Sequence, residues 1–243
     1  IIITGMIVGS LPFAHYLAMV RGGWRSLLND PQVRWFLILA VGLVLLLIWH
    51  LMQTGLGFGE AVRQASFNGV SIMTGTGYVS ANFSAWGGFA TTILLIVMFI
   101  GGCGGSTTCG IKVFRLQVLA STAKVQISRL LRPHAVVLAY YNKRPVSVEV
   151  MDSVMGFFYL FILGFVLIAI MLGMAGLDFV TALSGAATSI SNVGPGLGEV
   201  IGADGNFSTL PDSAKWIMSF AMLLGRLEIF TVLVMLNPAF WQR

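Results

Sequence analysis

Two short polar stretches in this apolar chain offer backbone carbonyl groups as their main chemistry. They read GVSIMTGTGYVS and ATSISNVGPGLG, and they match at an offset of 117 residues, from Gly77 to Gly194. Glycine adopts backbone angles that are poorly open to other residues, and the β-branched Thr76 and Val193 favour a stiff, extended chain. Loops of this kind can replace the water shell of a cation with aligned carbonyl oxygens.

Side-chain chemistry of the enzymatic kind is not indicated. The sequence shows no nucleophile and base pair, no phosphate-binding loop and no carboxylate dyad, and its histidines are isolated. Cys103 and Cys109 match neither a zinc-binding nor a thioredoxin-type spacing, so we expect both to be small buried hydrophobic residues. We therefore predict that the protein is not an enzyme.

The composition indicates that these loops lie in a membrane. Hydrophobic residues make up 57% of the 243 residues and charged residues 9%, and the mean hydropathy is +0.89, far from the values of a soluble domain. A helix of about 20 residues, rising roughly 1.5 Å per residue, crosses the roughly 30 Å hydrocarbon layer. The runs Trp35 to Leu56 and Phe157 to Met174 have suitable lengths, and shorter apolar runs lie at 89–100, 217–224 and 229–236. We predict an all-α membrane protein.

Charged residues indicate which side of the membrane each linker faces. Glu60, Glu199, Asp204 and Asp212 lie in polar segments with few basic residues, whereas two other linkers are basic. Because Lys and Arg accumulate in cytoplasmic loops, we expect the basic linkers in the cytoplasm, and we do not expect nucleic-acid binding. The basic residues are Arg21, Arg25 and Arg34 in the first linker, and Lys112, Arg115, Lys124, Arg129, Arg132, Lys143 and Arg144 in the second.

This topology leaves two short segments that must enter and leave the membrane on the outer side. Residues 61–73 and 178–190 carry helical patterns too short to span, and each precedes one of the glycine-containing loops, 74–78 and 191–195. Irregular backbone at membrane depth is tolerated where it is buried in protein or lines a cavity. We predict two pore units, each made of a helix, a re-entrant pore helix, a filter loop and a helix. Two loops that cap ordinary helices are the alternative.

The repeat also sets the predicted boundaries. The spanning helices of the later unit are expected at about 150–172 and 214–236. Because the chain opens inside an apolar run, we expect it to be a fragment of a longer protein. Its predicted segments are the end of an earlier spanning helix with a cytoplasmic linker at 1–34, one pore unit at 35–119, an amphipathic cytoplasmic linker at 120–149 and the other pore unit at 150–243.

A glycine-rich run interrupts the second spanning helix of the first of these units. It reads GGCGGSTTCG at 101–110, inside a helix that would otherwise extend from about 87 to 119. Each glycine costs a helix about 1 kcal/mol relative to alanine. We therefore expect a flexible intramembrane loop, with a kink that lets helices approach each other as the alternative.

Two ionisable residues lie in the last apolar run. Arg226 and Glu228 interrupt MLLGRLEIFTVLVML, and ionisable residues inside a membrane usually face a cavity or a partner. Two residues apart on a helix, they point about 200° away from each other. We therefore expect separate partners, with the partner of Glu228 on a neighbouring helix.

These motifs resemble a known family. TGTGYVS, SNVGPG and especially GGCGGSTTCGIKVFR resemble the pore-forming subunit of the Trk/Ktr/HKT superfamily of potassium transporters, most closely its bacterial Trk type. The resemblance implies four such units around one pore, of which this chain holds the third, the fourth and the tail of the second. The chain departs from the pattern at Pro195, which stands where the other unit has Tyr78. The resemblance implies that a potassium ion is bound by the backbone carbonyls of Thr76, Gly77, Val193 and Gly194.

The resemblance also implies a gate and partners. The intramembrane loop would obstruct the pore below the filter, and a cytosolic nucleotide-binding regulatory ring of the Trk-A type would be the partner. The basic amphipathic stretch 116–133 could receive that ring or lie along the membrane. A multi-pass homodimer in the bacterial inner membrane is the implied setting. The implied gate consists of Gly101, Gly102, Gly104, Gly105, Gly110 and Arg226.

Two other functions remain open from the residues. A re-entrant-hairpin carrier of another solute, organic or anionic, would aim its half-helix amino-termini at the substrate, and a scaffold subunit would transport nothing. Within potassium transport, the sequence leaves open channel-like flux and symport with protons or sodium. A duplicated half-helix and loop favours the pore, because a scaffold does not need them.

Overall fold

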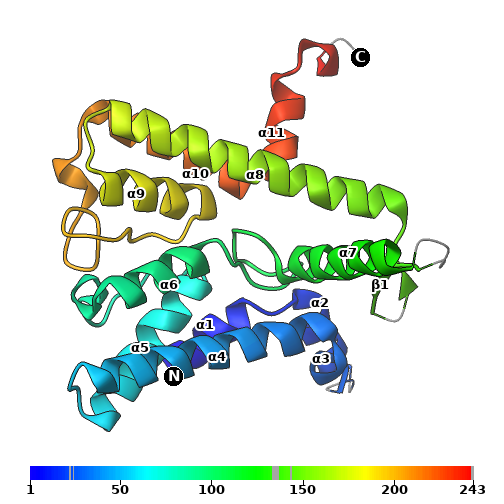
Figure 1. Cartoon of the computed structure of the whole chain (residues 1–243), viewed down its shortest axis with the longest axis horizontal. Coiled ribbons are helices and arrows are strands. Elements are labelled where there is room, and N and C mark those ends of the chain that lie inside the picture. The colour runs from blue at the N-terminus through cyan, green and yellow to red at the C-terminus, as the bar shows by residue number, and fades with distance from the viewer. Residues whose placement is uncertain (22, 24, 133–136, 143, 242–243) are drawn as a thin grey trace.

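The computed structural model describes the whole chain except residues 22, 24, 133–136, 143 and 242–243. The described residues form helices and one two-stranded antiparallel hairpin, in which β1 (Tyr140–Tyr141) pairs with β2 (Arg144–Pro145) (Figure 1). Lys143 of the predicted basic cluster lies outside the described residues. The α-helices are α1 Ile2–Gly9, α2 Phe13–Val20, α3 Arg25–Asn29, α4 Pro31–Gln53, α5 Phe58–Met73, α6 Gly88–Met98, α7 Val113–Leu131, α8 Val148–Met174, α9 Phe179–Ser191, α10 Asp212–Arg226 and α11 Ile229–Leu236. Short 3-10 helices lie at Phe83–Trp86, Phe207–Thr209 and Pro238–Phe240.

The same order of elements occurs twice. A long apolar helix (α4 or α8) is followed by a shorter helix packed against it (α5 or α9), a loop, and a further helix (α6 or α10). In the described part of the chain, α4 and α8 are each long and apolar enough to cross a membrane alone. Asp30 and Ser147 start these two helices by accepting hydrogen bonds from backbone amides of the first turn. Figure 1 shows α9 lying along α8, and α5 meeting α4 at one end.

The short helices α5 and α9 are the buried ones. In α9 the polar residues Thr181, Ser184, Thr188, Ser189 and Ser191 are buried along with their apolar neighbours. The long helices instead expose much of their apolar surface, as expected for helices that face lipid. The irregular backbone that follows α5 and α9 thus starts from buried helix ends, while Thr76, Tyr78 and Gly194 in the two loops are exposed. Such backbone is tolerated at membrane depth where it lines a cavity.

Phe99 joins the cores of the two repeats. It packs against both hydrophobic clusters, one built on α4, α5 and α6 and the other on α8, α9 and α10. Its ring makes edge contacts with Phe161 and Phe165 of α8, with centroids 6.0 and 5.0 Å apart. The two repeats are thus packed against each other directly beside the start of the glycine-rich segment.

The prediction of one unbroken spanning helix over 214–236 is wrong. The helix ends at Arg226, and α11 begins at Ile229 after a bend of 104°. Glu228 adopts a left-handed backbone angle (φ 59°) in this break. An unbroken helix would point Arg226 and Glu228 apart, whereas the break lets both side chains line one cavity.

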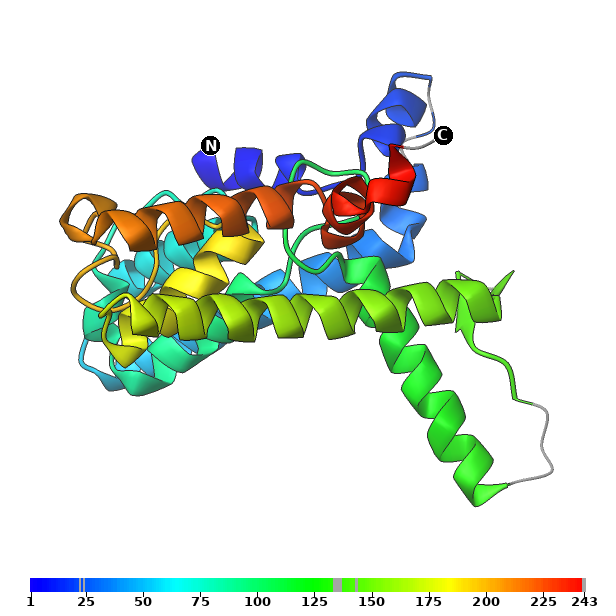
Figure 2. The same cartoon turned by 90° about the horizontal axis from the view of Figure 1, so that it is seen from above.

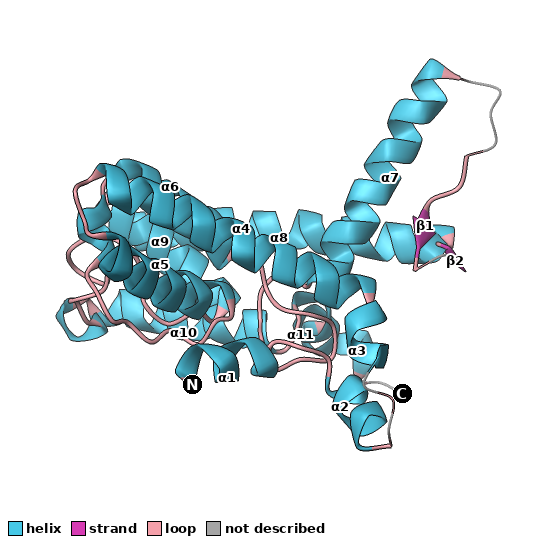
Figure 3. Ribbon diagram, turned by 90° about the horizontal axis from the view of Figure 1, so that it is seen from below, coloured by secondary structure: helices cyan, strands magenta, loops and turns pink. Residues whose placement is uncertain are grey.

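Two further helices differ from their predicted extents. The opening segment, expected as the end of a single spanning helix, is α1 and α2 joined at a bend of 101°, and Pro12 precedes α2. A residue before proline disfavours the helical region, which explains the break. Helix α7 runs through the predicted unit boundary at 119 to Leu131 and projects away from the bundle (Figures 2 and 3).

Candidate functional site

The loops that follow α5 and α9 are fixed by matching backbone hydrogen bonds. The amide of Thr76 donates to the carbonyl of Ser71 over 2.9 Å, and the amide of Val193 donates to the carbonyl of Thr188 over 3.0 Å. Donor and acceptor positions are each related by the 117-residue offset seen in the sequence. The two loops therefore leave their short helices in the same way, each using a carbonyl that the helix end would otherwise leave unpaired.

The next peptide in each loop is oriented in the same sense. The Gly77 amide donates to a carbonyl at the end of α5 over 3.3 Å, and the Gly194 amide donates to a hydroxyl at the end of α9 over 3.0 Å. In a trans peptide the C=O points opposite to the N–H of the following residue. The carbonyls of Thr76 and Val193 therefore point away from the helices that hold these loops.

The two loops meet at their glycines. Gly77 and Gly194 have positive φ angles of 75° and 117°, a region that disfavours side chains. A Cβ at Gly77 would collide with the carbonyl oxygen of Val193, and one at Gly194 would lie 3.4 Å from the Cα of Gly77. Glycine is thus required at Gly77 both by its backbone angle and by the neighbouring loop. Tyr78 is exposed, and the ring of Pro195 lies beside Gly77.

A small cavity lies between the loop at 74–78, helix α1 and the glycine-rich loop. It has a volume of about 310 Å³ and is lined by Thr74, Thr76 and Tyr78 on one side and by Ser10 and Thr107 on another, with α1 completing the wall. The hydroxyls of Thr74 and Thr76 are 2.7 Å apart. These hydroxyl oxygens can contact a cation or its water shell.

The two ends of the glycine-rich loop lie side by side and are joined by backbone hydrogen bonds. The amide of Gly101 donates to the carbonyl of Ile111 over 2.9 Å, and the amide of Ile111 donates to the carbonyl of Phe99 over 2.8 Å. A Cβ at Gly101 would collide with the carbonyl of Cys109. Gly101 is therefore required because the two ends of the loop approach closely there. Like the other glycines of the run, it also disfavours a continuous helix.

One side of this loop is bound by the break between α1 and α2. The amide of Cys103 donates to the carbonyl of Ser10 over 3.0 Å, and the amide of Thr107 donates to the carbonyl of Gly9 over 3.3 Å. The Thr107 hydroxyl donates to the same Gly9 carbonyl over 2.9 Å. The break in the first helix pair thus exposes carbonyls that an unbroken helix would use internally.

The other side of the loop is bound by Arg226. Its Nη1 donates to the carbonyl of Thr107 over 3.0 Å and lies 3.2 Å from Sγ of Cys109. Cys103 is buried as expected, but Cys109 is only half-buried and serves as a partner of the guanidinium. Glu228 instead pairs with Arg115 of α7, so the prediction of separate partners is confirmed.

A polar cavity of about 370 Å³ lies where these groups meet. Its walls include the loop from Gly105 to Gly110 and the side chains of Lys112, Arg115, Arg226 and Glu228. The ammonium of Lys112 donates to the carbonyl of Thr108. The cavity therefore holds three basic groups and one carboxylate next to the loop, an electrostatic environment that opposes cations.

The later filter loop also contacts the helix that carries Arg226. Asn192 ends α9 in the left-handed conformation (φ 53°), and its side-chain amide donates to the carbonyl of Met222 in α10 over 3.1 Å. A Cβ at Gly225 would collide with the carbonyl of Ile190. The missing side chain at Gly225 therefore allows α10 to lie against the end of α9, next to Arg226.

Among the described residues, no group of three or more His, Cys, Asp or Glu side chains is arranged to hold a metal ion. The polar side chains that line the cavity beside the loop at 74–78 carry hydroxyl groups. Such neutral oxygen ligands suit an alkali cation that must enter and leave.

Comparison with known proteins gives matches over nearly the whole chain. A family model described as TrkH, cation transport protein, matches residues 17–243. The chain is 45% identical over 239 residues to the Trk system potassium uptake protein TrkI of Halomonas elongata, covering 98% of this chain and 48% of that protein. It is 38% identical over 238 residues to the Trk system potassium uptake protein TrkH of Vibrio parahaemolyticus, covering 94% of this chain and 47% of that protein.

A solved structure agrees with the fold. The crystal structure of the potassium transporter TrkH from Vibrio parahaemolyticus matches with a TM-score of 0.91 and 35% sequence identity, over 98% of this chain and 52% of that one. The predicted all-α membrane fold is thereby confirmed. The chain spans about half the length of the relatives it matches.

Proposed function

This chain belongs to the TrkH family of cation transport proteins, and from that premise we propose that it supplies two of the four units of a potassium uptake pore. The units are 35–119 and 150–243, and potassium is the transported substrate rather than a cofactor. The observation that carries the proposal is the meeting of two filter loops with matched hydrogen bonds at Gly77 and Gly194.

In this proposal the carbonyls of the filter loops replace the water around the ion. The peptides between Thr76 and Gly77 and between Val193 and Gly194 both turn their N–H groups toward their short helices. Their carbonyls are therefore available for the ion, with those of Gly77 and Gly194 forming the next layer. Potassium enters from the outer side, sheds water at these oxygens and passes to the threonine-lined cavity below.

The glycine-rich loop and Arg226 then form the gate. The loop crosses below the cavity, held by α1 on one side and by Arg226 on the other. A fixed positive charge about 4 Å from a cation costs about 4 kcal/mol at an effective dielectric constant of about 20. A barrier of that height lowers the rate of ion passage about a thousandfold. Opening the path therefore requires that Arg226 and the loop move away together.

The proposed setting is the bacterial inner membrane, with a Trk-A-type nucleotide-binding subunit on the cytoplasmic side and a second copy of the transporter as partner. Helix α7 supports this because it projects from the bundle and combines basic residues with exposed Ile127, Leu130 and Leu131. Such a surface suits binding to another protein.

The test is ion flux into liposomes that contain the intact transporter polypeptide. We expect uptake of rubidium, as a tracer for potassium, and no uptake of glutamate or phosphate. Gly194→Ser should abolish the preference for rubidium over sodium, because a side chain at this positive φ strains the loop backbone beside Gly77 of the other loop. Gly55→Ser is the matched control, since Gly55 has a similar φ of 92° but open space around it. Uptake of the anions, or no uptake of any solute by the native protein, would reject the proposal.

A further inference from the structure

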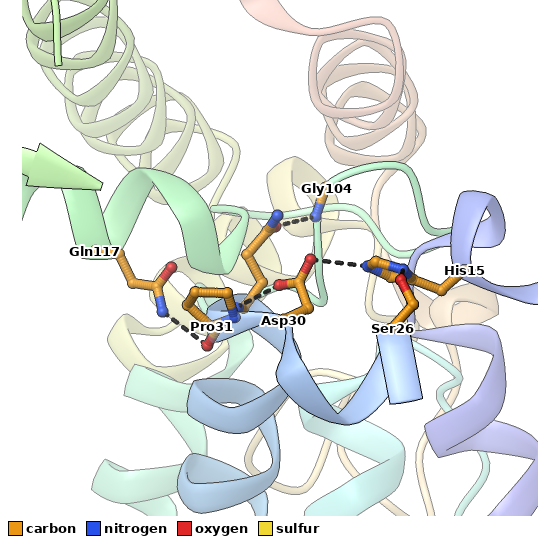
Figure 4. A network of polar contacts seen from close by, with 7 residues as sticks. His15, Ser26, Asp30, Pro31, Gly104 and Gln117 are labelled. Atoms are coloured by element: carbon orange, nitrogen blue, oxygen red, sulfur yellow. Dashed lines mark hydrogen bonds and ion pairs between the residues drawn. The ribbon is translucent and has the colours of Figure 1, made fainter. Parts of the chain in front are cut away.

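A polar junction at the start of α4 contacts the glycine-rich loop at Gly104 (Figure 4). The junction consists of Asp30, Pro31 and Gln32, which begin the first long helix. Oε1 of Gln32 accepts a hydrogen bond from the amide of Gly104 over 2.9 Å, and the contact is partly buried. Gln32 and Gly104 are 72 residues apart in sequence, so this is a tertiary contact.

Gln32 is held in place by a chain of charged and polar groups. The backbone amide of Gln32 donates to Oδ1 of Asp30 over 2.7 Å. The other carboxylate oxygen of Asp30, Oδ2, lies 2.8 Å from Nε2 of His15 in α2. The other ring nitrogen of His15 lies 3.0 Å from the hydroxyl of Ser26. The side chains of His15 and Asp30 are 19% and 15% exposed. Both carboxylate oxygens are thus used, and the first turn of α4 has a fixed orientation.

The cytoplasmic linker reaches the same junction. Nε2 of Gln117 in α7 donates to the carbonyl of Pro31 over 3.0 Å. Burial raises the pKa of Tyr141 in β1 to about 12, the charge of Asp30 adds to this rise, and a hydrogen bond with the Gln32 side chain opposes it. Tyr141 therefore stays neutral at physiological pH. Helix α7 thus contacts Pro31, and β1 contacts Gln32, the residue that binds the loop.

We propose that Gln32 is a positioning residue of the gate, which holds the Gly104 end of the glycine-rich loop while Arg226 holds the Thr107 end. This inference rests on the proposed function of that loop. The physical basis is that, without Gln32, the backbone amide of Gly104 would lose this partner in a partly buried site. Leaving such a group unpaired costs free energy. A movement of α7 or β1 would reach the loop through the α4 junction.

The first measurement is hydrogen exchange of the loop in the intact transporter. Gln32→Met keeps the length of the side chain and removes the acceptor, so exchange at the Gly104 amide should accelerate about three- to tenfold, as expected for one hydrogen bond. Gln32→Glu restores an acceptor and should return exchange toward the native rate. Gln53→Met, at the opposite end of the same helix, is the control for a general effect on α4. Exchange in α8 reports whether each variant is folded.

The second measurement is rubidium flux of the same proteins. A released loop should change the maximal rubidium flux about threefold or more in Gln32→Met, with native flux in Gln53→Met and a return toward native flux in Gln32→Glu. Loop exchange that stays within about twofold of native in a folded Gln32→Met protein overturns the inference, whatever the flux. Absence of rubidium flux in the native protein would instead reject the proposed function, and the exchange result would still decide the role of Gln32.

Discussion

Arg115 in α7 and Glu228 in the break between α10 and α11 form an ion pair, with 3.0 Å between Nη2 and Oε2. The guanidinium of Arg115 also lies 3.8 Å from the centroid of the Phe157 ring, and its side chain is 13% exposed. Arg226, two residues before Glu228, binds the loop carbonyl of Thr107. The ion pair thus ties α7 to the short segment that sets the direction of Arg226.

Removing this ion pair should alter the gate. Glu228→Gln leaves the largely buried Arg115 guanidinium without its partner, whereas Arg115→Gln frees a carboxylate that is 54% exposed. We expect Glu228→Gln to raise rubidium flux by about three- to tenfold and Arg115→Gln to raise it by less. The double variant Arg115→Glu with Glu228→Arg should return flux toward the native value. Lys215→Gln is the control, because the Lys215 and Asp212 pair is exposed and such pairs contribute little. Equal effects of Lys215→Gln and Arg115→Gln would contradict the coupling.

Gly77→Ala should reduce selectivity more than an alanine at other positive-φ glycines. The new Cβ would collide with the carbonyl of Val193 and displace the later filter loop. Gly55→Ala shares the backbone strain but meets open space, so the difference between the two variants isolates the contact between the loops. The measurement is the ratio of rubidium to sodium flux, which should fall about tenfold or more in Gly77→Ala alone. Similar ratios in both variants would show that the contact is unimportant.

Arg226→Ala should raise ion flux, because it removes both a positive charge beside the path and a hydrogen bond to the loop. The effect should be largest when the transporter is otherwise closed. Arg63→Ala removes an exposed arginine of α5 and should leave flux near the native value. Unchanged or lower flux in Arg226→Ala, with intact expression, would exclude a gating role.

Asp178 should stabilise α9 in a pH-dependent manner. Hydrogen bonds from the Thr181 side chain and from backbone amides lower the pKa of this exposed carboxyl at the start of the helix. A group whose pKa is lowered by folding contributes fully above its unfolded pKa of about 3.9, and that contribution is lost as the pH falls through the folded value. Asp178→Ala should cost about 1 kcal/mol at pH 7, and this difference should shrink in strong acid. The measurement is thermal unfolding in detergent, in which Asp178→Asn should keep most of the cap and lose the pH dependence.

The repeat and its loops could be predicted because their signals are local. Uninterrupted apolar runs mark α4 and α8, and the glycines at 77 and 194 mark positions that need special backbone angles. The composition of the glycine-rich run is sufficient to predict a loop. The expectation of separate partners for Arg226 and Glu228 is confirmed, but its premise of one continuous helix is wrong, because the helix is broken between these two residues.

The breaks in the other helices could not be predicted from apolar runs. Nothing in the sequence between Arg226 and Ile229 opposes a helix, and the break coincides with tertiary contacts of Arg226 and Glu228 that the sequence does not show. Pro12 was a usable signal for the bend after α1. Asp30 followed by Pro31 is typical of a helix start, but its link to the loop through Gln32 depends on residues 72 positions apart.

The hydrogen bonds between the end of α1 and the glycine-rich loop join mainly main-chain atoms. The carbonyls of Gly9 and Ser10 accept from the amides of Thr107 and Cys103, and alanine at any of these positions preserves a donor or acceptor. Alanine scanning would therefore detect Arg226 but, on this side of the loop, only the hydroxyl of Thr107. Cys103→Pro, which removes the amide hydrogen, or an ester in place of that peptide bond would reveal a restraint that alanine scanning cannot detect.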